Sequence, residues 1–284
     1  CDVLELADVF TKSIDTLWDS HHVFLPNYIG MPAAPWAAFL RHDPTLRIPL
    51  YTNSIFPEFF ATMTRGGVTS APLRYAKADE THSILYFDYN GLYPFVMQAY
   101  AYPSNAFDWY FPPREEEIIH GYGSFNDFLL KGLFKEMEEC NSGCCLTVDL
   151  EYPADVAIAT NDYPFAPEHR MIREEYYKSD GELTDFLKDW SIANENAKMA
   201  VFEGLVATVY NKYQYTCHWK LLKWYIEHGL KVTKIYWGVV FDEDFYLASY
   251  IRKNIELRNG RSDPLGKTVY KLMGNSIYGK TFES

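Results

Sequence analysis

The segment that most constrains this chain is residues 267–279, KTVYKLMGNSIYG. On a helix, its polar and cationic residues share one face, within an arc of roughly 80° at about 100° per residue. Those residues are Lys267, Lys271, Asn275 and Tyr278, with Gly274 beside them. Two ammonium groups one turn apart suit phosphate, and a residue without a side chain leaves room for a flat base. The segment therefore predicts a helix with one face fit for a nucleoside triphosphate.

A second informative segment lies far upstream. The apolar run at residues 83–87, SILYF, ends in Asp88 and is followed by the turn residues Asn90-Gly91 and a helical run to Tyr100. We expect a short buried strand that carries the Asp88 carboxylate at its end. A carboxylate there would suit Mg²⁺ at the floor of a cleft. The alternative is that Asp88 belongs only to the turn, because Asp and Asn favour turns.

The rest of the chain mixes helix and strand patterns. At 284 residues and 48% hydrophobic it can bury a sizeable core, which predicts an α/β protein of two or more lobes. The Pro-rich stretch 41–57 predicts a linker, and Asn259-Gly260 predicts a break between two helices of a hairpin. Helices are expected over residues 1–20, 36–40, 219–228 and 246–258 and, after breaks at Asn259-Gly260 and Pro264, through residues 267–279. Strands are expected over 144–152, 201–210, 213–218 and 231–241.

Charge and cysteine content limit the class of protein. The net charge of −12 counts against a nucleic-acid surface spread over the whole chain, but basic residues concentrate between Arg252 and Lys280. A mostly acidic body with one basic element is therefore expected. The sequence has no run of 18 apolar residues and no secretion signal, so we expect an intracellular protein without a membrane partner. Its five cysteines favour a reducing compartment, and Cys140, Cys144 and Cys145 lack the second pair that a zinc site needs.

The two segments together resemble motifs of family B DNA polymerases. Residues 88–94, DYNGLYP, resemble motif A (DxxSLYP), and residues 271–279, KLMGNSIYG, resemble motif B (KxxxNSxYG). Residues 149–153, 161–164 and 205–241 resemble the insertion of the protein-primed members, which occur in linear plasmids, adenoviruses, certain phages and self-synthesising transposons. Residues 2–10 resemble the last exonuclease motif.

The resemblance implies a domain order. Residues 1–50 would end a 3′-5′ exonuclease domain of the RNase H-like type, and residues 51–104 would form the first half of the palm. Residues 105–245 would be the inserted domain, and residues 246–284 the fingers. The expected fold is thus the α+β palm and fingers of a right-hand polymerase. The compartment would be the nucleus, a mitochondrion or a viral replication site.

The resemblance also implies roles. The reaction would be template-directed DNA synthesis, in which two Mg²⁺ ions, or Mn²⁺, assist an in-line displacement. Asp88 would bind the metal ions, Lys271 the triphosphate, and Asp2 a metal of the exonuclease site. Further nucleotide-binding residues would be Gly91, Leu92, Tyr93, Lys267, Asn275 and Tyr278, and DNA-binding residues Arg65, Gly66, Gly67, Ser276 and Gly279. The partners would be a DNA template and primer, a dNTP and a terminal protein that primes synthesis.

Three departures from the family pattern matter. The Tyr expected before Asp2 and the two earlier exonuclease carboxylate motifs are not in this chain, so the exonuclease site would be incomplete. Gly91 stands where the family usually has Ser, and we expect its backbone amide to serve instead. The chain also ends before the Asp-containing motif C, which would carry the other half of the metal site. We therefore expect that these 284 residues alone do not extend a primer.

Two other functions compete with this reading. Residues 274–281, GNSIYGKT, satisfy the phosphate-loop pattern GxxxxGK[ST], but that pattern works only between a strand and a helix. The second alternative is a catalytically inactive relic of a mobile element that binds DNA or a terminal protein. Intact Asp88 and Lys271 oppose it, whereas the acidic balance favours it.

Overall fold

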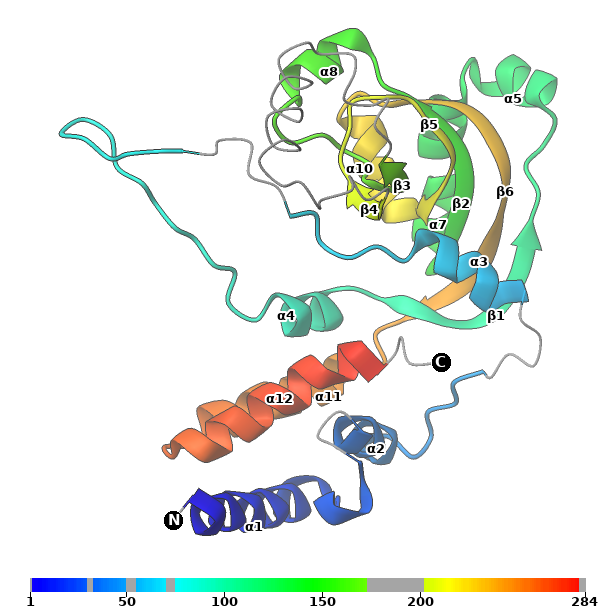
Figure 1. Cartoon of the computed structure of the whole chain (residues 1–284). Helices are drawn as coiled ribbons and strands as arrows, with labels where there is room; N and C mark the ends of the chain where they lie inside the picture. The colour runs from blue at the N-terminus through cyan, green and yellow to red at the C-terminus, as the bar shows by residue number, and fades with distance from the viewer. Residues whose placement is uncertain (1, 30–32, 50–54, 70–74, 173–201, 281–284) are drawn as a thin grey trace. The chain divides into compact units, whose positions relative to one another are not determined.

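The structure is a computed structural model that describes residues 2–29, 33–49, 55–69, 75–172 and 202–280 (Figure 1). The chain divides into two compact units. The first consists of residues 1–50, 78–106 and 241–284, and the second of residues 51–77 and 107–240. Each unit has its own buried cluster of apolar side chains. The chain is therefore a mixed helix and strand protein with two cores, and the domain identities given above remain predictions.

The first unit is mainly helical. Its core gathers large buried side chains from several helices, among them Leu17, Phe39, Tyr250 and Met273. Helices α11 and α12 pack against each other, as the hairpin prediction requires, and both contact α4. The elements are α1 (Asp2–His21), the short η1 (Leu25–Asn27), α2 (Ala33–His42), α4 (Leu92–Ala99), α11 (Ala248–Asn259) and α12 (Pro264–Lys280).

Helix α12 begins where its sequence predicts. The Asp263 carboxylate accepts a hydrogen bond from the Gly266 amide at 2.6 Å, and Pro264 occupies the first helical position. An acceptor at the cap and a proline directly after it are both favourable at a helix start. Val269 and Met273 are buried, while Lys267 and Lys271 are exposed. The helix is thus amphipathic, as the spacing of its residues indicates.

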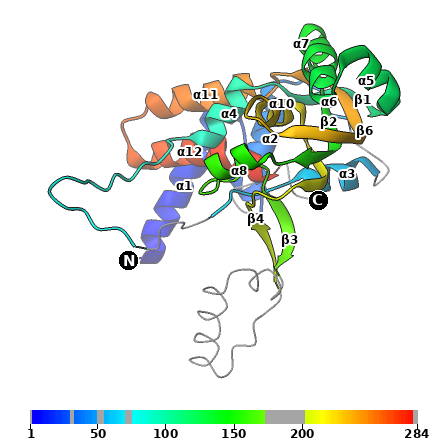
Figure 2. The same ribbon diagram turned by 90° about the horizontal axis from the view of Figure 1, so that it is seen from above.

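The second unit contains most of a sheet of four strands in the order β1-β6-β2-β5, in which the start of β1 and the end of β6 belong to the first unit. Strands β2 and β5 are antiparallel, with Leu146 opposite Cys217. A separate antiparallel pair, β3 and β4, lies side by side in Figure 2. The strands are β1 (Tyr102–Tyr110), β2 (Ser142–Glu151), β3 (Glu168–Ile172), β4 (Phe202–Val206), β5 (Lys212–His218) and β6 (Lys231–Asp244).

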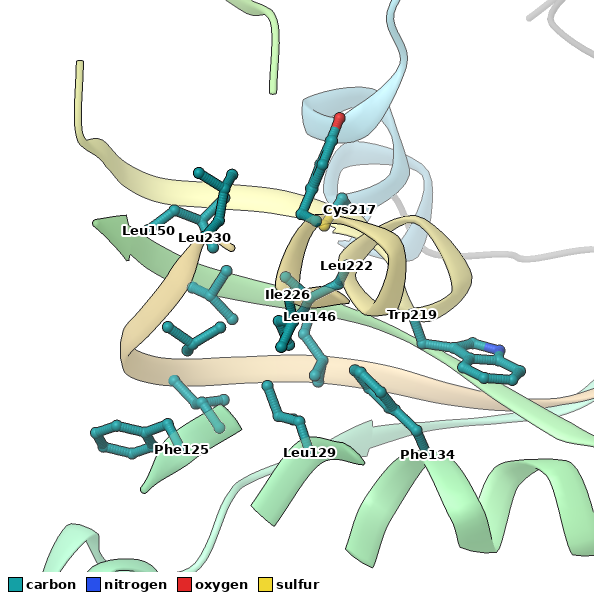
Figure 3. Close-up of a cluster of buried hydrophobic side chains, with 14 of the residues drawn as sticks. Phe125, Leu129, Phe134, Leu146, Leu150, Cys217, Trp219, Leu222, Ile226 and Leu230 are labelled. Carbon is teal, nitrogen blue, oxygen red and sulfur yellow. The ribbon is translucent and has the colours of Figure 1, made fainter. Parts of the chain in front are cut away.

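Helices cover this sheet and complete the second core. Figure 3 shows Phe125, Leu129 and Phe134 facing Leu146 of β2 and Leu222 of α10. Burial of such side chains is the main source of stability for a unit of this size. The helices are α3 (Ile55–Met63), α5 (Glu115–Tyr122), α6 (Phe125–Asp127), η2 (Phe128–Leu133), α7 (Phe134–Cys140), α8 (Ala154–Ala159) and α10 (Trp219–Glu227).

A fully buried lysine links β5 to β3. The Lys212 ammonium donates to Glu168 Oε1 at 2.9 Å and to the Thr208 carbonyl oxygen at 2.9 Å. Burial lowers the pKa of Lys212, and the hydrogen bond and charge of Glu168 act against that shift. A buried ammonium is tolerated only when it is paired in this way. The pair therefore fixes the start of β3 against the sheet.

One predicted strand is wrong. Residues 82–89 form no regular structure, and the side chains of the expected buried strand are exposed, with Tyr86 at 94% and Phe87 at 83%. An apolar run favours an extended backbone, but a strand also needs a neighbour for its amides and carbonyls. No described strand pairs with this run. Asp88 thus lies in a loop before α4.

The interpretation of 41–57 as a linker is also partly wrong, because α3 starts at Ile55. Pro57 lies in the first turn of that helix, where a missing amide proton costs no intrahelical hydrogen bond. The remaining predicted helices and the strands at 144–152, 213–218 and 231–241 are confirmed to within a few residues. Residue 201, the expected start of the strand at 201–210, lies outside the described residues, and β4 covers only Phe202–Val206 of that range.

The described part of the chain has neither a membrane-spanning helix nor a cluster of metal ligands. No helix there is long and apolar enough to cross a membrane. Cys144 and Cys145 are buried in β2 while Cys140 is exposed at the end of α7, and no group of three or more described His, Cys, Asp or Glu side chains is placed to hold a metal ion.

Candidate nucleotide site

A cavity of about 600 Å³ lies among α4, α11 and α12 in the first unit. Its lining includes four residues singled out from the sequence, namely Asp88, Gly91, Lys271 and Asn275. The first two precede α4, and the last two lie on the polar face of α12. A volume of this size falls within the range of about 300–1,000 Å³ that is usual for small-molecule sites. The two predicted motifs thus meet at one cavity.

Helices α4 and α12 approach closely at Gly274. A β-carbon built on Gly274 would lie 3.6 Å from Pro94 Cγ, an ordinary van der Waals contact. Gly274 itself is buried and lines the cavity beside Lys271. Glycine is therefore not required by the packing of the two helices. The absence of a side chain at Gly274 instead leaves space within the cavity.

The backbone conformation of Gly91 gives a reason for glycine where the motif that the segment resembles usually has Ser. It precedes α4 with φ of 68°, in the left-handed region. Glycine adopts this conformation without penalty, whereas a residue with a β-carbon is strained there. Its carbonyl oxygen accepts a hydrogen bond from the Phe95 amide at 3.0 Å, which starts the helix. The local backbone alone therefore accounts for a glycine at this position.

Tyr93 and Tyr278 contact each other rather than the cavity. Their ring centroids are 4.4 Å apart with an interplanar angle of 32°, and neither residue lines the cavity. Burial raises the pKa of Tyr278 above its ordinary value, and the neighbouring Tyr93 adds to the shift. Tyr278 therefore keeps its proton at neutral pH. The two predicted nucleotide-binding tyrosines lie together at the junction of α4 and α12.

Helix α11 contributes two polar residues that the motifs do not contain. Asn254 and Arg258 line the cavity one helical turn apart. Arg258 is exposed, whereas Asn254 is only 2% exposed. Sequence reasoning grouped Arg258 with the other basic residues and gave Asn254 no role. The usable signal is the i, i+3, i+4, i+7 spacing of Ile251, Asn254, Ile255 and Arg258, which puts a buried amide and a guanidinium on one face.

Other predicted site residues lie outside this cavity. Lys267 is exposed on α12 one turn before Lys271, and Asp2 is exposed in the first turn of α1. Leu92 is 46% exposed at the start of α4. Ser276 is half-buried and Gly279 exposed near the end of α12. None of these five residues lines the cavity.

The predicted DNA-binding residues of the second unit follow α3. One guanidinium nitrogen of Arg65 donates to the Thr216 carbonyl oxygen at 2.8 Å, and the guanidinium lies 4.1 Å from the centre of the Tyr215 ring. Arg65 therefore holds this segment against β5. Gly66 and Gly67 do not adopt the left-handed conformation, and a β-carbon on either would meet no atom within 4 Å. A role for these residues in DNA binding remains a prediction.

The resemblance implies a magnesium ion, which needs oxygen ligands at the cavity. Among the described residues, Asp88 is the one carboxylate that lines the cavity. Mg²⁺ in nucleotide sites uses one or two carboxylates together with substrate phosphates and water. Asp88 fits such a set as the single protein ligand, with phosphate oxygens and water completing the coordination of the ion.

The chain was compared with known proteins in three ways. No protein-family model matches it, and no curated protein or solved structure matches it at a significant level. The assignment of a family therefore depends on the motifs and on the cavity at which they meet.

Proposed function

We propose that this chain is the nucleotide-binding part of a family B DNA polymerase of the protein-primed type. The observation that carries the proposal is the cavity of the first unit, which is lined by Asp88 and Gly91 of one motif and by Lys271 and Asn275 of the other. A match of two short segments to the motifs of a family could arise by chance. Their joint placement around one cavity of suitable size is a second, independent requirement.

The charges around the cavity suit a metal-bound triphosphate. Lys271 and Arg258 supply two cations and Asp88 a single carboxylate. A guanidinium can bind two phosphate oxygens at once, and an ammonium acts as a point charge beside them. A bound Mg²⁺ ion would neutralise phosphate charge and activate the attacking hydroxyl. Asp88 would hold it, while Lys271 and Arg258 orient the phosphates.

The macromolecular partners are inferred from the resemblance alone. DNA template, primer and a terminal protein belong to the full polymerase reaction. The isolated chain should bind a dNTP and should not extend a primer. An inactive relic would have no reason to retain Asp88 and Lys271, and a chain that does not bind a dNTP would favour the relic.

The structure offers no support for a phosphate-loop NTPase. Residues 274–280 continue α12 without a break, and the segment before them is also helical. Backbone amides inside a helix are already hydrogen-bonded and cannot encircle a phosphate. Thr281, the last residue of that pattern, lies outside the described residues.

The test is the affinity of the chain for dATP with Mg²⁺, measured by isothermal titration calorimetry. Lys271→Met removes the ammonium and keeps the apolar stem. Loss of a hydrogen bond to a charged group should weaken binding about 10- to 100-fold. Arg252→Met is the matched control, because Arg252 is an exposed cation of α11 that does not line the cavity. Equal losses in both variants, or no binding by the unaltered chain, would contradict the proposal.

A further inference from the structure

The cavity contains a buried acceptor without a donor. The Asn254 amide nitrogen donates to the Tyr250 carbonyl oxygen at 3.0 Å, which accounts for one side of the amide. Its oxygen is buried and has no hydrogen-bond partner in the described part of the chain. Leaving such an acceptor unpaired is unfavourable, because the oxygen has lost its hydrogen bonds to water. An unpaired buried group at the wall of a ligand site calls for a functional explanation.

Arg258 is placed to supply the missing donor. It lies four residues after Asn254 on the same face of α11, and both residues line the cavity. Side chains on a helix lean toward its N-terminus, so a residue at i+4 extends over the turn of residue i. The Arg258 side chain is exposed, which leaves it free to move along the cavity wall.

We propose that Asn254 is a positioning residue, whose oxygen accepts a hydrogen bond from the Arg258 guanidinium when a triphosphate occupies the cavity. This inference rests on the proposed function. Guanidinium has five N–H donors, of which a bidentate phosphate contact uses two. A third N–H group that donates to the Asn254 oxygen fixes the plane of the guanidinium. The two N–H groups that bind phosphate then face the phosphates. Because the oxygen is buried, the contact forms through a small rotation of Asn254 toward the cavity.

A double-mutant cycle tests the proposal. Asn254→Leu removes the acceptor at similar volume, and Arg258→Lys keeps the positive charge but removes the fork. With dATP and Mg²⁺ as the probe, each single change should raise the dissociation constant about tenfold, the loss expected for one well-placed hydrogen bond. The double variant should bind no more weakly than the weaker single variant, because the second change removes an interaction already lost.

A second cycle provides the matched control. Asn254→Leu combined with Lys271→Met should give fold-changes that multiply, since Lys271 binds the phosphates from α12 independently of Asn254. Thermal unfolding of each variant separates positioning from support of the fold. Asn254→Leu should unfold close to the temperature of the unaltered chain, because it removes the unpaired oxygen together with one hydrogen bond to Tyr250. If leucine prevents folding, Asn254→Ala removes the same acceptor without adding bulk.

Two results would overturn the inference. One is an unchanged dATP affinity in Asn254→Leu and Asn254→Ala, and the other is fold-changes that multiply in the cycle with Arg258→Lys. Failure of the proposed function looks different, because dATP would then not bind or would bind independently of Lys271. In that case the inference falls with it.

Discussion

Gly91 shows how a single backbone angle can decide residue identity. Its φ of 68° places it in the left-handed region at the start of α4, and the space where a β-carbon would lie is empty. Gly91→Ser should therefore lower the free energy of unfolding by about 1–2 kcal/mol through backbone strain alone. Gly91→Asn is the control, because Asn tolerates this conformation better and should cost less. Urea unfolding checks both, and an equal cost for Asn and Ser would count against strain as the cause.

His21 should make stability depend on pH. It is 5% exposed, its Nε2 has no described partner, and Lys253, His42 and His22 lie near it. Burial chiefly, and these charges next, lower the pKa of His21 from 6.5 to about 4. The unfolded chain therefore takes up the proton first as pH falls, so stability is full above pH 6.5 and is lost toward pH 4. A shift of this size corresponds to about 3 kcal/mol.

The measurement is urea unfolding of the unaltered chain and of His21→Gln between pH 7 and pH 5. Glutamine does not titrate, so the variant should lose less stability over this range. Carboxylates contribute equally to both proteins and cancel in the difference. Parallel curves for the two proteins would show that His21 is not the group responsible.

At the scale of elements, α12 combines features that its sequence predicts with one that packing reveals. Its polar face, its start at Pro264 and its contact with α11 follow from residue spacing and helix caps. The close approach of Pro94 to Gly274 does not, because it depends on how α4 packs. The same limit explains the wrong strand at 83–87. A local pattern specifies a preference, but a strand exists only where a neighbour pairs with it.

A substitution at Gly274 distinguishes a role in helix packing from a role in ligand binding. A β-carbon there would make an ordinary contact with Pro94, and alanine favours a helix interior over glycine by about 1 kcal/mol. Gly274→Ala should therefore leave the unfolding free energy unchanged or raise it. Because the methyl group enters the cavity, dATP should bind several-fold more weakly. A variant that is destabilised and binds dATP normally would show that Gly274 serves packing instead.

At the scale of the whole molecule, the sequence predicted most of the helices and strands, whereas the roles of the site residues stay predictions. Asp88, Gly91, Lys271 and Asn275 were found because short motifs preserve the spacing that chemistry requires, and the structure brings them to one cavity. Asn254 and Arg258 were missed because their helix has no motif and becomes part of the site only through packing. Two compact units agree with the expectation of two or more lobes, but no local pattern indicates that residues 51–77 belong with residues 107–240.

Hydrogen–deuterium exchange with and without dATP and Mg²⁺ tests the central claim most directly. That claim is that the start of α4 and the polar face of α12 form one nucleotide site. Ligand binding should slow exchange in peptides covering residues 88–99 and in those covering residues 264–280, and leave β2 and β5 unchanged. Slowing in only one of the two regions, or in neither, would contradict the account.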